Sequence, residues 1–228
     1  MQCIDIDHVS KRFNDKTVID DISLAINCNE SYSLLGKNGA GKSTLLKMIS
    51  GLLKVDSGTI KIKGMDTRSD DVKKIIGFLP EEAFPYMSLT VYENLMYIAS
   101  LRDVKNIDER VDFLMDFFEL KQYKNYKIME LSRGNRQRLS LALSMMHDPE
   151  ILLLDEPFNY IDIMMQKKII NYFRDLNSTF IISTHVMNIT DFTENIIIIN
   201  NSKISFSGKK EEIIENESIY DAVSRLIS

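Results

Sequence analysis

A glycine-rich segment near the N-terminus has the composition of a phosphate-binding loop. Residues 36–44 read GKNGAGKST and match the pattern G-x-x-x-x-G-K-[ST]. Glycines let the backbone wrap so that successive N–H groups point at phosphate oxygens, and a following helix adds its positive end. Lys42 is placed to reach the β- and γ-phosphates of a nucleotide, and the Ser43 hydroxyl is a ligand for Mg²⁺. The predicted cradle comprises Gly36, Lys37, Asn38, Gly39, Ala40, Gly41, Lys42, Ser43 and Thr44.

The alternative for this segment is a glycine-rich turn that binds nothing. The bare pattern arises by chance in about one chain in a hundred at average residue frequencies. Here the pattern also lies between an apolar strand-like segment, Tyr32–Leu35, and a helical pattern that begins at Lys42. That context favours a nucleotide site.

An acidic pair follows the apolar segment Ile151–Leu154. Ligands of parallel α/β folds bind beyond the carboxyl ends of the strands, where Asp155 and Glu156 stand. Asp155 can hold Mg²⁺ through its water shell, and Glu156 can polarise a water that attacks the γ-phosphate. Such a pair is common by itself, but the preceding phosphate loop on the same chain favours catalysis.

A third segment, Leu131–Leu139, offers a second helix start. Ser132 is an N-cap candidate, and Gly134 permits close approach of another group to the backbone. The helix that begins there therefore has a second phosphate-binding end, although a simple helix cap explains the same residues.

The elements that must position these residues follow from hydrophobic periodicity. The first thirty residues alternate apolar and polar positions, which is typical of antiparallel strands with one exposed face. Fully apolar segments separated by helical patterns indicate a mostly parallel sheet covered on both faces. Strands are predicted at Tyr32–Leu35, Thr59–Ile62, Ile75–Leu79, Ile151–Leu154, Phe180–Ser183 and Ile196–Ile199, and helices at Lys42–Leu53, Val91–Leu101, Ile107–Leu120 and Arg133–His147.

These elements predict one α/β domain spanning residues 1–228. It has a phosphate-loop core with a mostly parallel sheet, an N-terminal antiparallel β subdomain, and a helical subdomain inserted at about 82–146. The helix at Ile107 is expected to open with a capping-box-like pair, Asn106 and Glu109.

Composition excludes several classes of protein. The chain has 228 residues, 44% of them hydrophobic, which suffices for a sizeable core. Its net charge of −5 argues against a surface that coats nucleic acid. The histidines His8, His147 and His185 are too scattered to indicate a metal cluster, and Cys3 and Cys28 are expected to be reduced. Without a bilayer-length apolar run or a signal peptide, we expect a soluble cytoplasmic protein.

The order of the motifs resembles that of ABC-type ATPases over nearly the whole chain, since the third segment is similar to that family's L-S-G-G-Q signature. The resemblance implies that Phe13 stacks on adenine with Val18 nearby, and that Ser132 and Gly134 bind the ATP held by a second chain. It also implies that Asp162 belongs to a loop contacting the other subunit and that His185 contacts the γ-phosphate. The expected cofactors are ATP and Mg²⁺.

The sequence departs from the family's pattern at several positions. Glu81 stands where a glutamine is usual and is expected to ligate Mg²⁺ and orient water. Arg133 and Asn135 replace a glycine and a glutamine of the signature, and Tyr160 and Ile161 replace a Gly and Leu pair. Because Lys42, Asp155, Glu156 and His185 are all present, we predict an active ATPase. The departures resemble the branch that serves multidrug and antimicrobial-peptide export.

The resemblance implies a subunit that powers a membrane permease, with a second ATP-binding subunit, identical or different, as its dimer partner. It would lie peripherally on the cytoplasmic face of the cell membrane and bind no nucleic acid. The permease is expected to dock near Glu81–Leu101, where Phe84, Tyr86, Met87, Leu89 and Tyr92 cluster. The alternatives are a soluble ABC-type ATPase without a permease and a non-hydrolysing ATP-binding partner in a heterodimer.

Overall fold

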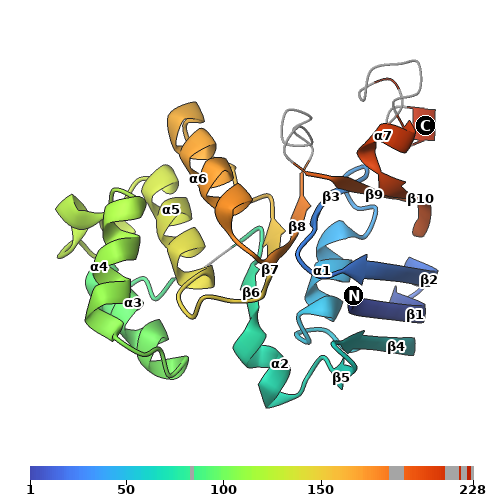
Figure 1. The fold of residues 1–228 in the computed structure, drawn as a ribbon, viewed down its shortest axis with the longest axis horizontal. Coiled ribbons are helices and arrows are strands. Elements are labelled where there is room, and N and C mark those ends of the chain that lie inside the picture. The colour runs from blue at the N-terminus through green and yellow to red at the C-terminus, as the bar shows by residue number, and fades with distance from the viewer. Residues whose placement is uncertain (83–84, 185–192, 214–220, 222–224, 227–228) are drawn as a thin grey trace.

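The computed structural model describes residues 1–82, 85–184, 193–213, 221 and 225–226. In this part of the chain the strands form two sheets, one of six strands and one of four (Figure 1). The six-stranded sheet has the order β10-β9-β3-β8-β7-β6. Its strands are β3 (Ser31–Leu35), β6 (Ile76–Leu79), β7 (Ile151–Asp155), β8 (Thr179–Ser183), β9 (Asn195–Asn200) and β10 (Lys203–Lys209).

The six-stranded sheet is parallel except at one edge, as predicted. β3 pairs in parallel with β8 and β9, and β7 pairs in parallel with β6 and β8. Only β10 runs antiparallel, against β9. Every residue of β7 and β8 is buried, because helices cover both faces of the sheet. The carboxyl ends of β3 and β7 therefore lie at the same edge.

Alternate residues of the central strands belong to two hydrophobic cores. Leu152 and Leu154 pack with α3 (Val91–Leu101), α4 (Ile107–Phe117), α5 (Arg133–Ser144) and α6 (Ile163–Asp175). Ile151 and Leu153 pack on the opposite face with α1 (Lys42–Ile49) and the second sheet. Figure 1 shows α5 and α6 on one side of β7 and α1 on the other. The phosphate loop and the start of α5 are therefore held on opposite faces of one sheet.

The second sheet has the order β2-β1-β4-β5 and is antiparallel. Its strands are β1 (Gln2–Phe13), β2 (Lys16–Asn27), β4 (Ser57–Ile62) and β5 (Met65–Asp66). The predicted alternation holds in β1, where Ile4 and Ile6 are buried while Asp5 and Asp7 are exposed. The hairpin of β1 and β2 brings Phe13 and Lys16 face to face beside the phosphate loop.

Several helix ends differ from the predictions. α1 ends at Ile49 rather than Leu53, because Gly51 adopts a φ of +75° that leaves the helix. Asn106 is the N-cap of α4, but its side chain makes no capping bond: its φ is +53°, and its amide instead donates to the Glu109 carboxylate at 3.3 Å. A true capping box opens α3, where Thr90 and Glu93 exchange both hydrogen bonds.

The remaining elements are short. They are α2 (Asp70–Ile75), α7 (Lys210–Ile213) and two 3₁₀ turns, Lys121–Tyr123 and Ile128–Glu130. Among the helices of the described residues, none combines the length and the apolar character needed to cross a bilayer.

A half-buried histidine after α5 makes the stability of the fold pH-dependent. The His147 ring donates from Nε2 to the Ile76 carbonyl at 3.0 Å, since that oxygen can only accept. Burial and the nearby Arg102 guanidinium lower the pKa of His147 to about 4. An unfolded histidine titrates near 6.5, so the unfolded chain binds more protons between pH 6.5 and pH 4. The contribution of neutral His147 to the free energy of unfolding is therefore fully present above pH 6.5, and it is lost as the pH falls toward 4.

We predict that the free energy of unfolding falls by about 2 kcal/mol between pH 7.5 and pH 5 because of this group. Urea titrations at the two pH values measure the difference. His147→Gln, which does not titrate, should remove that part of the loss. The exposed His8→Gln is the control and should retain it. An equal pH dependence in wild type and His147→Gln contradicts the assignment.

Candidate functional site

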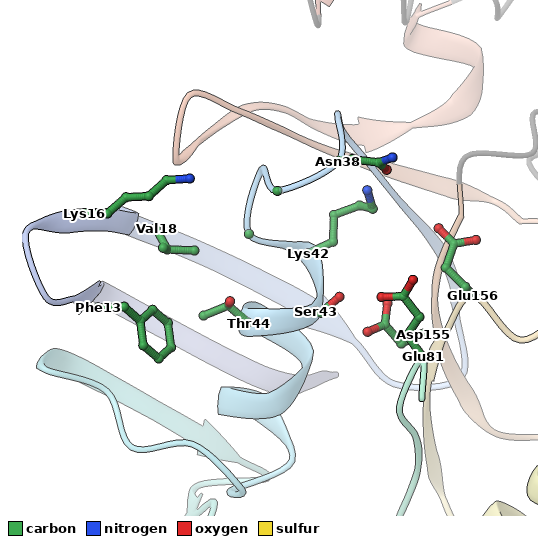
Figure 2. Close-up of a pocket in the computed structure, with 12 residues that line it drawn as sticks. Phe13, Lys16, Val18, Asn38, Lys42, Ser43, Thr44, Glu81, Asp155 and Glu156 are labelled. Carbon is green, nitrogen blue, oxygen red and sulfur yellow. The ribbon is translucent and has the colours of Figure 1, made fainter. Parts of the chain in front are cut away.

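A cavity of about 530 Å³ lies at the carboxyl ends of β3 and β7. Figure 2 shows its walls: the β1–β2 hairpin on one side, the phosphate loop and α1 in the middle, and three carboxylates opposite the hairpin. The lining residues are Phe13, Lys16, Val18, Asn38, Gly39, Gly41, Lys42, Ser43, Thr44, Glu81, Asp155 and Glu156. Segments far apart in sequence therefore contribute to one site, and most of the residues predicted for it meet there.

The phosphate loop ends in a glycine that no other residue replaces without strain. Gly41 is the N-cap of α1 and has a φ of +112°. A Cβ at this position would lie 2.8 Å from the Val18 carbonyl oxygen and 2.8 Å from the Ile19 side chain. α1 has no side-chain cap and no acidic residue in its first turn. Its first backbone N–H groups therefore remain available to an anion in the cavity.

Lys42 is buried at the start of α1, with a relative exposure of 7%. Its Nζ donates to the Gly36 carbonyl at 2.8 Å and to the Lys37 carbonyl at 3.4 Å. Burial lowers the pKa of Lys42, and the nearby carboxylates of Glu156 and Asp155 oppose that shift. The ammonium group is thus held inside the loop, where it can turn from carbonyl oxygens to phosphate oxygens.

Asp155 has a carboxylate oxygen that lacks a partner. The Ser183 hydroxyl donates to Oδ1, whereas Oδ2 is buried and has no hydrogen-bond partner among the described residues. The Ser43 hydroxyl and the Glu81 carboxylate line the same cavity. Carboxylate and hydroxyl oxygens are the donors that Mg²⁺ prefers, and an ion bound near Oδ2 would satisfy it. These three residues therefore fit a magnesium ion.

Glu156 is fixed by its backbone. Its φ is +49°, which is unusual for a residue with a side chain, and it is only 6% exposed. Its N–H donates to the Ser183 carbonyl and to the Ser183 hydroxyl, both at 3.1 Å. Ser183 thus holds both acidic residues in place. No local sequence pattern indicates this role of Ser183, because it depends on the pairing of β7 with β8.

The far end of the cavity is apolar. Phe13 is 45% exposed, and its ring lies beside Val18 at the open end (Figure 2). The Lys11 ammonium stands 5.6 Å from the centroid of the Phe13 ring. An exposed aromatic face next to a phosphate loop is suited to stacking on a nucleobase. One lining residue, Lys16, belongs to no sequence motif and is not among the predicted site residues.

Ser132 and Gly134 do not line this cavity. They stand at the start of α5, where the Ser132 hydroxyl caps the helix by accepting from the Asn135 N–H at 3.3 Å. A Cβ on Gly134 would lie 2.7 Å from the Tyr160 carbonyl oxygen, so glycine is needed for this contact. The Arg133 guanidinium lies 5.5 Å from the centroid of the Tyr160 ring. Two departures from the family pattern therefore contact each other.

The loop after Glu156 is hydrogen-bonded to side chains of α5. Gln137 donates to the Pro157 carbonyl at 3.0 Å, and Arg138 donates to Asp162 at 2.5 Å. Asp162 also caps α6 by accepting from the Met165 N–H, and this bond, together with Arg138, lowers its pKa. The segment that bears the catalytic candidate Glu156 is thus coupled to the helix that begins at Ser132. His185 lies outside the described residues.

Comparison with known proteins identifies the family. Residues 19–159 match the family described as ABC transporter. The lipopolysaccharide export system ATP-binding protein LptB of Haemophilus influenzae is 33% identical and covers 96% of this chain and 95% of its own. The sulfate/thiosulfate import ATP-binding protein CysA of Mesostigma viride is 32% identical over 92% of this chain and 63% of its own.

Among solved structures, the dimeric, post-hydrolysis ATP-binding cassette MJ0796 bound to ADP and Pi is similar. Its TM-score is 0.82 with 26% identity, and the match covers 90% of this chain and 98% of that one. The fold, the cavity and the sequence matches agree. The chain therefore belongs to the ABC transporter family of ATP-binding subunits, whose nucleotide-binding cassettes hydrolyse ATP.

Proposed function

We propose that this chain powers the export cycle of an integral membrane permease, as one of two ATP-binding subunits on the cytoplasmic face of the membrane. The observation that carries the proposal is the separation of two phosphate-binding ends within one chain. The phosphate loop lines the cavity, whereas the start of α5 at Ser132 lies on the other face of the sheet. The phosphate loop and the start of α5 can therefore bind the same nucleotide only if they belong to different chains.

A head-to-tail pair of chains places the start of α5 of each against the cavity of the other. The surface beside that helix start is suited to such contact. Tyr160, Ile163 and Met164 are 66%, 69% and 76% exposed, and they follow one another around the loop and first turn of α6. Covering these apolar side chains with a second chain removes them from water. The dimeric cassette with similar fold supports this arrangement.

Several residues of the cavity then have roles in hydrolysis. Lys42 and the N–H groups of the loop bind the β- and γ-phosphates of ATP. Ser43, Asp155 and Glu81 would hold Mg²⁺, which supplies positive charge for the phosphate oxygens. Glu156 accepts the proton of the attacking water. The role of contacting the γ-phosphate is assigned to His185 by the family resemblance alone. Loss of the γ-phosphate removes the contact that joins the chains, so the pair reopens.

A second cavity, of about 260 Å³, is suited to receive the permease. It lies between β6, α3 and α5 and is lined by Tyr86, Pro85, Ile98 and Leu143, among others. Tyr86 and Met87 are 49% and 38% exposed, whereas Tyr92 packs against the helical core. Phe84 lies outside the described residues. A short cytoplasmic helix of the permease bound in this second cavity, which forms an open groove, would move together with α3 and α5.

The export direction rests on the two departures Glu81 and Arg133, which resemble the export branch of the family. Related ATP-binding subunits include one of an export system and one of an import system, LptB and CysA. In this proposal the permease selects the transported substrate, and this chain supplies the energy of ATP hydrolysis without determining substrate specificity.

The permease assignment is tested by purifying the chain from detergent-solubilised membranes of its native host. We predict that an integral membrane protein co-purifies with wild type, and that Tyr86→Glu lowers its yield about tenfold or more, since the change places a charge in the groove. Leu52→Glu, at an exposed apolar residue outside the groove, is the matched control. Wild-type ATPase that recovers no membrane protein would instead favour a soluble ATPase.

A further inference from the structure

Lys16 is the one cation at the apolar end of the nucleotide cavity, among the residues that line it. It is the first residue of β2 and pairs with Phe13, the last residue of β1, across the hairpin turn. Lys16 and Val18 are two positions apart on β2, so their side chains leave the same face of the strand. In Figure 2 the Lys16 side chain extends over Val18 toward the phosphate loop.

The charge of Lys16 is unmatched in the described part of the chain. It forms no ion pair and no side-chain hydrogen bond there, and the residue is exposed. The carboxylates of the cavity, Glu81, Asp155 and Glu156, lie at the opposite end, beside Lys42 (Figure 2). The cavity therefore has two cationic positions, one buried among carboxylates and one open and unpaired.

A nucleotide that stacks on Phe13 and reaches Lys42 must cross the space beside Lys16. The group that crosses there is the sugar and the phosphate attached to it, because the base lies on Phe13 and the terminal phosphates reach Lys42. We propose that Lys16 binds the phosphate nearest the ribose and so contributes to the affinity for ATP and for ADP alike. The inference rests on the proposed nucleotide site and names a further residue of that site.

This contact has a different consequence from that of Lys42. The α-phosphate is present before and after hydrolysis, so Lys16 stabilises the substrate and product complexes equally. Removing its charge raises the KM and leaves kcat unchanged. Because Lys16 is exposed, the interaction is partly screened, and the effect weakens as the salt concentration rises.

The test measures the dissociation constants of Mg-ATP and Mg-ADP for the purified full chain. Lys16→Met, which keeps the aliphatic stem, should raise both constants by the same factor, about two- to fivefold. Lys16→Glu should raise them further, and Lys16→Arg should stay close to wild type. The difference between wild type and Lys16→Met should shrink in high salt, which a packing defect of the hairpin would not do. Lys61→Met, at an exposed lysine of β4 outside the cavity, controls for net charge.

Each other outcome overturns the inference. Unchanged affinity in Lys16→Met excludes a phosphate contact, and a loss for ATP without a loss for ADP places the contact at the γ-phosphate instead. Equal losses in Lys16→Met and Lys16→Arg assign the effect to packing rather than charge. These results leave the proposed function intact if wild type binds nucleotide, whereas wild type that binds neither ATP nor ADP overturns both.

Discussion

Replacing Glu156 by Gln is expected to slow ATP hydrolysis about 10²- to 10⁴-fold, the usual contribution of a general base. Glutamine has nearly the same shape as glutamate but cannot accept the proton of the attacking water. The backbone N–H of residue 156 keeps its two bonds to Ser183, so the loop geometry is retained. The affinity for Mg-ATP should stay within about twofold of wild type, since the carboxylate is not needed to bind the phosphates.

The measurement is phosphate release under saturating Mg-ATP, together with an ATP binding titration of the same preparation. In the proposed cycle hydrolysis reopens the pair of chains, so the variant should also accumulate as a dimer with ATP, which size-exclusion chromatography detects. Glu82→Gln is the matched control, because Glu82 is an exposed neighbour of Glu81 that does not line the cavity. Normal turnover in Glu156→Gln would place the base at another residue.

The sequence predicts the central part of this site well, for a local reason. A buried strand, a glycine-rich turn and a helix start are consecutive in the chain, so the local pattern places Gly36–Lys42 between β3 and α1. The same holds for Asp155 and Glu156, which follow the apolar strand β7 directly. Hydrophobic periodicity and local composition therefore suffice to place the phosphate loop and the acidic pair at the carboxyl edge of a parallel sheet.

Contacts made across the fold could not be predicted in this way. Ser183 bonds both acidic residues only because β8 lies beside β7. Arg133 and Tyr160 both depart from the family pattern, yet nothing in their spacing of 27 residues indicates that the two side chains meet. Both residues also occupy locally unfavourable positions, since Arg133 is a cation at a positive helix start and Tyr160 is a bulky residue with a φ of +63°.

The helix ends also show features that local sequence does not determine. Asn106 and Glu109 have the right types and spacing for a capping box, but a φ of +53° at Asn106 turns its side chain away from the helix N–H groups. Thr90 and Glu93 form the box at α3 instead. Residue type predicts that a helix begins nearby, and the backbone conformation decides which residue caps it.

Lys42→Ala is expected to weaken Mg-ATP binding about 100-fold, which corresponds to roughly 2.7 kcal/mol. The lost group is a buried cation, and in the proposed site it faces the terminal phosphates, where little water would screen its charge. Isothermal titration calorimetry with Mg-ATP measures the change. The effect should exceed that of Lys16→Met because Lys42 is buried and Lys16 is exposed.

The apo protein provides the check against simple misfolding of Lys42→Ala. Burial already lowers the pKa of Lys42, which means that the folded chain bears a cost for keeping this cation desolvated. Removing the cation relieves that cost, so the Tm without nucleotide should not fall, while the rise in Tm that a given Mg-ATP concentration causes should be much smaller than in wild type. Lys47→Ala, at an exposed position of the same helix, should retain that rise. If Lys42→Ala bound ATP as wild type does, the loop would not be the phosphate cradle, and the dimer built on it would have no basis.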